Sequence, residues 1–266
     1  MVAILSREQL QASAPSVFAA SPWERMSGRY RMVPTIDVVD MLGEQGFRPV
    51  RALQGRTRIP GKGDFTRHLI RFRHDDHIGP LAVGQELPEL VLTNSHDGTA
   101  AYQFMAGVFR LVCSNGLTVQ SADFGSISIR HSGGADFRER VIDATYQVID
   151  QAPRSMAAIE GWKGISLTRP QQLAMASAAH EIRPNDAIKP AFLLTARRNE
   201  DYTDAEGNRD LWTTANVLQE NLVQGGLRGR ASTGRRVTTR PIKGVAEDIR
   251  TNRALWRLTE EMAKLA

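Results

Sequence analysis

The sequence predicts an α+β fold, in which an N-terminal antiparallel β-sheet with a short helix is followed by a helical C-terminal half. Two observations lead to this prediction. Segments with two-residue alternation, separated by turn sequences, fill residues 47–130, and segments with helical periodicity follow from residue 135. A strand-rich half before a helix-rich half is typical of α+β proteins, because strands and helices alternate along the chain in α/β proteins.

Two short helices are expected first. Ser6 and Gln9 have capping-box spacing, so a helix should begin directly after Ser6. Thr35 is expected to cap a second, amphipathic helix, which ends at the glycines 43 and 46.

A β-hairpin is predicted next. Alternating residues occupy 47–59 and 65–74, and a Gly-Lys-Gly turn lies between them. Further strands are expected over residues 89–94, 102–113 and 117–130, because Asp-Gly and Asn-Gly turn sequences separate these segments.

The C-terminal half is predicted to be all helical. Helices are expected over residues 135–160, after the capping box of Thr168 and Gln171, near Pro190, and over residues 210–224 and 245–265. We expect an N-terminal helix and lead-in (1–28), an α+β core domain (29–224, with the sheet in 29–132 and helices in 135–224), and a basic Gly/Arg segment with the C-terminal helix (225–266).

Composition sets the outer limits. The 266 residues, of which 41% are hydrophobic and 24% charged, are enough to bury a core. The single cysteine, Cys113, allows no intramolecular disulfide; we expect it to be a buried thiol in a reducing compartment. No apolar run approaches the ~20 residues of a membrane span, and no secretory leader is evident. We therefore expect a cytoplasmic protein with no membrane partner.

Basic residues gather in two clusters of a chain whose formal net charge is +5. The first basic cluster, in residues 47–74, contains one acid, Asp64, and eight cations: Arg48, Arg51, Arg56, Arg58, Lys62, Arg67, Arg71 and Arg73. The second basic cluster, in residues 225–243, contains no acid and six cations: Arg228, Arg230, Arg235, Arg236, Arg240 and Lys243.

These clusters predict binding to nucleic acid through its phosphates. Because side chains alternate along a strand, most cations of the first basic cluster are expected on one sheet face. Arginine suits bidentate phosphate contacts, and counterion release favours binding to a polyanion. The second basic cluster is expected to become ordered on binding. The predicted contact residues are Arg48, Arg56, Arg58, Lys62, Arg67, Arg71, Arg73 and all six cations of the second basic cluster. A solvated sheet face and a flexible basic loop would give the same composition.

Four segments resemble one family. They are residues 35–50 (TIDVVDMLGEQGFRPV), 94–99 (NSHDGT), 110–117 (RLVCSNGL), and Leu211-Trp212 followed by Asn216 and Gln219-Glu220-Asn221. On these segments the chain resembles the plasmid- and phage-associated "domain of unknown function 932" (DUF932) family. The resemblance covers most of residues 30–225 and implies a context of mobile DNA.

The predicted order of elements is also similar to that of ring-forming single-strand annealing proteins. This similarity implies that the basic hairpin lines a groove for DNA, which neighbouring subunits extend. The first hypothesis is therefore a homo-oligomeric protein of mobile genetic elements that binds or anneals single-stranded DNA in recombination or replication. It would be no enzyme and need no cofactor or ATP, since Gly61-Lys62-Gly63 is too short for a phosphate-binding loop.

Two other functions are consistent with the sequence. His74-Asp75-Asp76-His77 offers ligands for the divalent metal of a nuclease, although a polar surface turn explains the same residues. The basic surface could also bind an acidic protein, as in a phage or plasmid anti-defence module.

Three other groups of residues have both a structural and a functional interpretation. His96-Asp97-Gly98 is either a hairpin turn or the source of a general base. The polar residues of the 210–224 helix either face a partner or tie the helix to nearby loops. The aromatic candidates for base stacking, each equally consistent with a place in the core, are Phe65, Phe72 and Tyr102.

Overall fold

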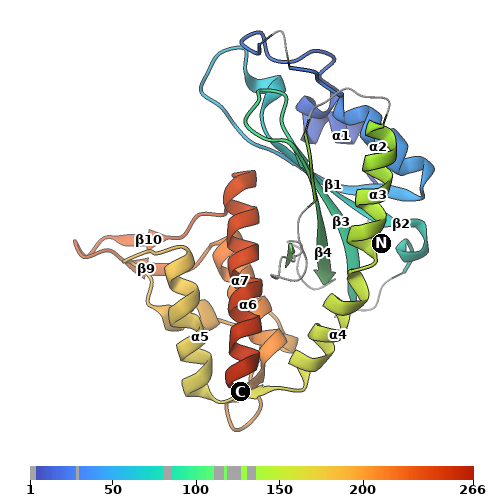
Figure 1. Cartoon of the computed structure of the whole chain (residues 1–266). Helices are drawn as coiled ribbons and strands as arrows, with labels where there is room; N and C mark the ends of the chain where they lie inside the picture. The colour runs from blue at the N-terminus through green and yellow to red at the C-terminus, as the bar shows by residue number, and fades with distance from the viewer. Residues whose placement is uncertain (1–3, 28–29, 81–84, 111–116, 119–126, 131–135) are drawn as a thin grey trace. The chain divides into compact units, whose positions relative to one another are not determined.

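The computed structural model describes residues 4–27, 30–80, 85–110, 117–118, 127–130 and 136–266. Contacts divide the chain into two compact units. The sheet unit comprises Met1–Val112 and Ala122–Ala152, and the helical unit comprises Cys113–Ser121 and Pro153–Ala266. The predicted α+β fold is confirmed: an antiparallel sheet occupies the N-terminal part of the chain, and helices dominate the C-terminal part (Figure 1).

The sheet unit contains five described strands in the antiparallel order β1-β2-β3-β4-β6. Its helices are α1 (Arg7–Ser13), α2 (Thr35–Glu44) and α3 (Phe137–Ile149), and its strands are β1 (Phe47–Gln54), β2 (His68–His74), β3 (Glu86–Asn94), β4 (Tyr102–Arg110) and β6 (Ile127–Ile129). Three 3-10 helices complete it: η1 (Pro15–Phe18), η2 (Gly63–Phe65) and η3 (Asp75–His77).

The predicted hairpin is confirmed, because β1 and β2 pair in antiparallel register from Phe47–His74 to Gln54–His68. Its first strand is shorter than we predicted. It ends at Gln54, and residues 55–67 form a loop whose ends are joined by a hydrogen bond from Gly55 N to Arg67 O (2.7 Å).

One face of the sheet packs against α3. Phe72 on β2 and Leu90 on β3 lie beside Val148, and all three are at most 2% exposed. At the other end of α3, Phe137 meets Tyr102 edge to face at 5.5 Å. Burial of side chains of this size stabilises the unit by about 1.5–3 kcal/mol each, so this face is the main hydrophobic core of the sheet unit.

The two N-terminal helices begin in different ways. Ser6 and Gln9 form the predicted capping box at the start of α1. The prediction that Thr35 caps α2 was wrong. Pro34 occupies the cap position, and Thr35 is the first helical residue and is fully buried, with its hydroxyl hydrogen-bonded to the side chain of His68.

The helical unit contains four α-helices: α4 (Ala152–Lys163), α5 (Arg169–Ile182), α6 (Leu211–Gln224) and α7 (Val245–Leu265). Two 3-10 helices, η4 (Pro190–Leu194) and η5 (Asn199–Asp201), follow α5. Its short strands are β5 (Leu117–Thr118), β7 (Ser166–Leu167), β8 (Arg209–Asp210), β9 (Arg228–Arg230) and β10 (Arg236–Thr238).

Helix α6 forms the centre of this unit, since every residue from 211 to 223 is buried. The rings of Trp162, Trp212 and Trp256 pack together there, with centroids 4.6 to 6.4 Å apart. Aromatic contacts of this geometry add to the free energy gained by burial. These three tryptophans join α4, α6 and α7 in one core.

Two predictions for the C-terminal half need correction. The helix expected over 135–160 is two helices, because Pro153 in the first turn of α4 lacks an N–H and disfavours helical backbone just before it. The half is also not all helical: β7 pairs with β8, and β9 pairs with β10. The capping box of α5 and the bounds of α7 are confirmed. No helix in the described parts of the chain is long and apolar enough to span a membrane.

Candidate nucleic-acid interface

The second basic cluster lies on and around a two-stranded ribbon formed by β9 and β10. We expected residues 225–243 to gain order on binding; instead, this segment forms an antiparallel ribbon that extends from the helices of its unit (Figure 1). The ribbon turns through Gly234, whose φ of +81° favours glycine. All six cations of the second basic cluster are exposed.

Ribbon and body are joined by close backbone contacts. Arg230 N donates a hydrogen bond to Ala187 O (3.0 Å) in the α5–η4 connection. At Gly229, a Cβ atom would lie 1.8 Å from the same oxygen, so only glycine permits this approach. At the base of the ribbon, Arg183 Nη1 donates to the carbonyl oxygens of Leu222 and Arg240, both at 2.8 Å. The ribbon therefore has a fixed position on the helical unit.

The cations of the ribbon form no ion pairs within the described chain. Arg230 lies directly opposite Arg236 in the ladder. Among the residues that the structure describes, no carboxylate forms an ion pair with any of the six cations. Like charges directly opposite each other destabilise a strand pair. An anion bound between them would remove this repulsion.

A pocket of about 810 Å³ lies beside the ribbon and contains an exposed aromatic ring. Arg228, Arg230 and Arg236 line it from the ribbon, and Lys189 and Phe192 line it from the start of η4. The lining also contains one acid, Asp186, which forms no ion pair with these cations among the described residues. The side chain of Phe192 is 40% exposed. A cationic groove with an aromatic ring is the arrangement that binds the phosphates of a single strand and stacks a base.

The first basic cluster is arranged differently. Arg71 and Arg73 on β2 are 6% and 2% exposed. Both pair with the buried carboxylate of Glu89 on β3, and the distance from Arg73 Nε to Glu89 Oε1 is 2.8 Å. Both guanidinium groups also lie over the ring of Phe109 on β4. Both arginines were predicted to contact phosphates; in the structure, neighbouring strands place a carboxylate and an aromatic ring beside them.

Two more cations of the first basic cluster are paired at the edges of the sheet. Arg48 makes a two-point contact with Asp75, at 2.9 and 2.8 Å. Lys62 pairs with Asp97 at 2.9 Å and lies over the ring of Trp23.

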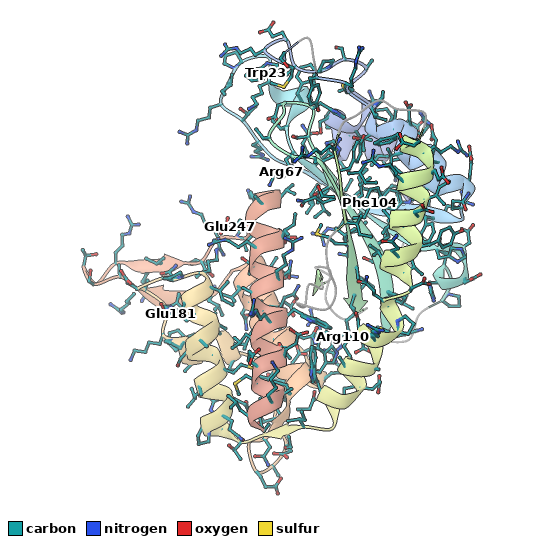
Figure 2. All side chains as sticks on the ribbon, in the orientation of Figure 1. Trp23, Arg67, Phe104, Arg110, Glu181 and Glu247 are labelled. Atoms are coloured by element: carbon teal, nitrogen blue, oxygen red, sulfur yellow. The ribbon has the colours of Figure 1, made fainter. Side chains whose placement is uncertain are left out.

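The remaining predicted contacts of this cluster lie in the β1–β2 loop. Arg67 donates to Thr99 O (3.0 Å), and Figure 2 shows it at the end of the sheet unit where Trp23 lies. Arg56 and Arg58 are exposed and have no ion pair with a described residue. Much of the positive charge of the first basic cluster is thus used within the fold, and these two arginines are its open part.

The segment His74–His77 forms a turn at the end of β2. Both oxygens of Asp75 accept from Arg48, and His74 Nδ1 lies 3.0 Å from Asp76 Oδ2. No group of three His, Cys, Asp or Glu side chains among the described residues has the geometry to hold a metal ion. These contacts favour the surface-turn interpretation of the segment.

The segment 94–99 is a hairpin turn with a buried polar network beneath it. Thr35 Oγ1 lies within 3.2 Å of polar atoms of four side chains, those of His68, Asn94, His96 and Tyr102. All five residues are fully buried. The network joins α2 to β2, β3 and β4. It gives His96, which the sequence also offered as a general base, a structural role.

Asp97 anchors the same turn. Burial alone would raise the pKa of Asp97, but hydrogen bonds from Thr99, Lys62 and Ser95 outweigh burial and lower the pKa to about 2. Its partner Lys62 was predicted to contact phosphate. In the structure, the ammonium group of Lys62 is part of this turn, and its side chain is only 15% exposed.

The polar residues of α6 tie the helix to its own unit. Glu220 accepts two hydrogen bonds of 2.6 Å from Arg198, and Gln219 donates to Asn252 on α7 (3.0 Å). Asn216 donates to Trp212 O (2.7 Å). The structural interpretation of this helix is therefore confirmed.

Sequence reasoning missed the exposed aromatic residue of the candidate interface. Two of the candidates for base stacking, Phe72 and Tyr102, are fully buried, and Phe65 is half-buried. Phe192 lies in the apolar run Ala191-Phe192-Leu193-Leu194, which is typical of a core segment and gives no sign of an exposed ring. Its exposure depends on the 3-10 geometry of η4, in which Leu193 and Leu194 are buried instead. Cys113 lies outside the described residues.

Comparison with known proteins identifies the family. Over 97% of its length, the chain is 40% identical to UPF0380 protein YafZ and 39% identical to UPF0380 protein YfjQ, both of Escherichia coli K12, and the match covers 91% of each. No solved structure matches the chain. The model of the family described as Domain of unknown function (DUF932) matches residues 22–256. The chain therefore belongs to the DUF932 family.

Proposed function

We propose that this protein binds nucleic acid through the β9–β10 ribbon and prefers single strands. One observation carries the proposal: six exposed cations without carboxylate partners in the described chain lie on and around a ribbon that borders a pocket with an exposed phenylalanine. Phosphates bound there would gain from counterion release. They would also relieve the repulsion between Arg230 and Arg236.

The preference for single strands follows from Phe192. A base stacks on an aromatic ring only when one of its faces is free, and in a duplex both faces are covered by neighbouring base pairs. The phenyl ring lies in the same pocket as three ribbon arginines, so one strand can contact both. Duplex DNA would have only the phosphate contacts.

The wider hypothesis from the sequence remains part of this proposal. It comprises strand annealing in recombination or replication, a context of mobile genetic elements, assembly of several copies of the chain, and a cytoplasmic location. The ribbon supports binding to a polyanion, and it would also support an acidic protein partner. The nuclease alternative has less support, because Arg48 occupies both oxygens of Asp75.

Fluorescence anisotropy with labelled single- and double-stranded oligonucleotides, at about 50 and 200 mM salt, tests the proposal. We expect binding that favours the single strand and weakens steeply with salt. Phe192→Leu should reduce the preference for single strands while leaving duplex binding unchanged. The absence of binding to either oligonucleotide at the lower salt would contradict the proposal and leave the acidic protein partner.

A further inference from the structure

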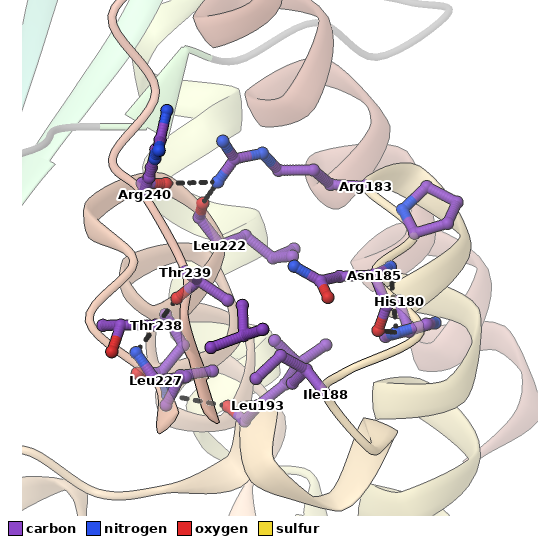
Figure 3. A pocket seen from close by; sticks show the side chains of 13 residues that line it. His180, Arg183, Asn185, Ile188, Leu193, Leu222, Leu227, Thr238, Thr239 and Arg240 are labelled. Atoms are coloured by element: carbon purple, nitrogen blue, oxygen red, sulfur yellow. Dashed lines mark hydrogen bonds between the residues drawn. The ribbon is translucent and has the colours of Figure 1, made fainter. Parts of the chain in front are cut away.

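A second pocket, of about 320 Å³, also borders β10. Its buried apolar lining includes Ile188, Leu193, Leu222 and Leu227 (Figure 3). Ligand pockets in proteins range from about 300 to 1,000 Å³ and are mostly apolar with a few polar groups. This pocket lies at the small end of that range and combines its apolar side chains with polar ones, so it has room for one small group.

One polar group at its rim is available to a ligand. Asn185 Oδ1 accepts a hydrogen bond from Ala187 N (3.0 Å), which fixes the orientation of the side-chain amide. Asn185 Nδ2 donates to no acceptor among the described residues. Figure 3 shows the side chain directed toward Leu222, across the pocket. The amide therefore offers N–H donors above an apolar floor.

The two pockets share one strand. Val237 and Thr238 of β10 line both the small pocket and the larger cationic pocket. A strand of nucleic acid whose phosphates lie on the arginines of the ribbon would therefore pass beside the small pocket. The base that follows the nucleotide bound at the ribbon would lie either in solvent or in this pocket.

We propose that the small pocket accepts one unstacked base of the bound single strand, with Asn185 Nδ2 donating to a ring nitrogen or carbonyl oxygen of that base. The inference rests on the proposed function, and it specifies how that interface holds its substrate. Apolar side chains that cover the faces of a base, together with a donor at its edge, are how proteins hold bases that leave the stack.

Fluorescence of 2-aminopurine, placed at one position after another in a single-stranded oligonucleotide, tests the inference. Stacking quenches this base analogue, so a base that enters the pocket becomes several-fold brighter at one position of the bound strand. Anisotropy of the same strand, labelled at its end, measures overall binding separately. Binding with equal fluorescence at every position would overturn the proposal that the pocket holds a base and would leave the proposed function intact. The absence of binding would overturn both.

Asn185→Ser is the matched variant. Serine keeps the site uncharged and keeps an oxygen that can accept from Ala187 N. Its side chain is one bond too short to place its hydroxyl donor where Asn185 Nδ2 lies. We expect base insertion to weaken by roughly tenfold, as the loss of one hydrogen bond predicts, while overall affinity changes little. Ser232→Ala, on the ribbon turn and outside both pockets, is the control and should leave the fluorescence at that position unchanged. Loss of the signal in both variants, or in neither, would overturn the role of Asn185.

A free nucleoside monophosphate distinguishes the two sources of the base. If the monophosphate removes the position-specific fluorescence while the oligonucleotide stays bound, the pocket binds a base from either source. If the signal persists, the pocket takes its base from the strand alone. Both outcomes support the inference, which equal fluorescence at every position of the bound strand would overturn.

Discussion

The two basic clusters look alike in the sequence and differ in the structure. In the first, Arg71 and Arg73 are buried against Glu89, and Lys62 is paired with Asp97. In the second, all six cations are exposed and none has an ion pair within the described residues. Density of positive charge along a chain therefore does not identify a binding surface. Whether the cations are free to bind an anion depends on the position of the acids in the fold. The acids that neutralise the first basic cluster, Glu89 and Asp97, come from other segments of the chain.

The largest expected effect is on the stability of the sheet unit. Glu89→Gln removes the carboxylate that Arg71 and Arg73 share, and it leaves two buried guanidinium groups without this partner. Removing one partner of a buried pair costs about 3–5 kcal/mol. Urea unfolding should show a loss of this size, whereas the exposed Glu200→Gln should change stability by less than about 0.5 kcal/mol. Equal, small losses in both variants would remove the distinction between the two clusters.

A smaller loss is expected at Asp97, and it depends on pH. The pKa of Asp97 is about 2 in the folded chain, against a usual value of 3.8. The unfolded chain therefore binds the proton more tightly, and the contribution of Asp97 to stability, about 2 kcal/mol, is fully present above about pH 4 and lost as the pH falls toward 2.

Unfolding of Asp97→Asn and the unmodified chain at about pH 7 and pH 3 measures this contribution. The two proteins should differ by about 2 kcal/mol at neutral pH and by clearly less at the lower pH. A difference that stays constant between the two pH values would show that the ion pair with Lys62 does not hold the charge of Asp97.

The third expected effect concerns the ribbon alone. Gly229→Ala places a methyl group against Ala187 O, so β9 must move away from the α5–η4 connection. We expect hydrogen exchange at the Arg230 amide, which donates to that oxygen, to speed up by about tenfold, the equivalent of 1.4 kcal/mol of local opening. Amides in α6 should keep their protection. Unchanged exchange at Arg230 would contradict the fixed position of the ribbon.

The smallest expected effect is a gain in stability. Arg230→Gln/Arg236→Gln removes two like charges from opposite positions of the ladder. Relief of this repulsion should stabilise the chain by up to about 1 kcal/mol at low salt, and less at high salt because exposed charges are screened. Thermal unfolding at two salt concentrations measures the gain. A loss of stability would mean that these arginines have a structural role like that of Arg71.

The sequence predicted the features of the fold that depend on neighbouring residues better than those that depend on residues far apart in the chain. Capping boxes at Ser6 and Thr168 are local, and both predictions were confirmed. Alternation also predicted the β1–β2 pair. It did not predict which residue lies beside Arg71, because Glu89 is on another strand and the partner of a strand face depends on the register of the whole sheet.

The arrangement of the candidate interface was predicted in part, for the same reason. The absence of acids between residues 225 and 243 marked the cations of the ribbon, and these are exposed. Pairing of β9 with β10 gave no signal, because neither strand has the alternating apolar residues that predict a strand. Phe192 comes from a separate element, and only folding places it beside Arg228.

The salt dependence of single-strand affinity in two matched double variants tests the central claim most directly. Arg230→Gln/Arg236→Gln and Arg56→Gln/Arg58→Gln remove the same charge, one pair from the ribbon and one from the exposed part of the first basic cluster. The ribbon variant should bind at least tenfold more weakly, and its slope of log affinity against log salt should fall by about 1.4 for two lost phosphate contacts. The other variant should keep the original slope. A fall in slope for Arg56→Gln/Arg58→Gln, with the ribbon variant unchanged, would contradict the account and place the binding surface on the sheet unit.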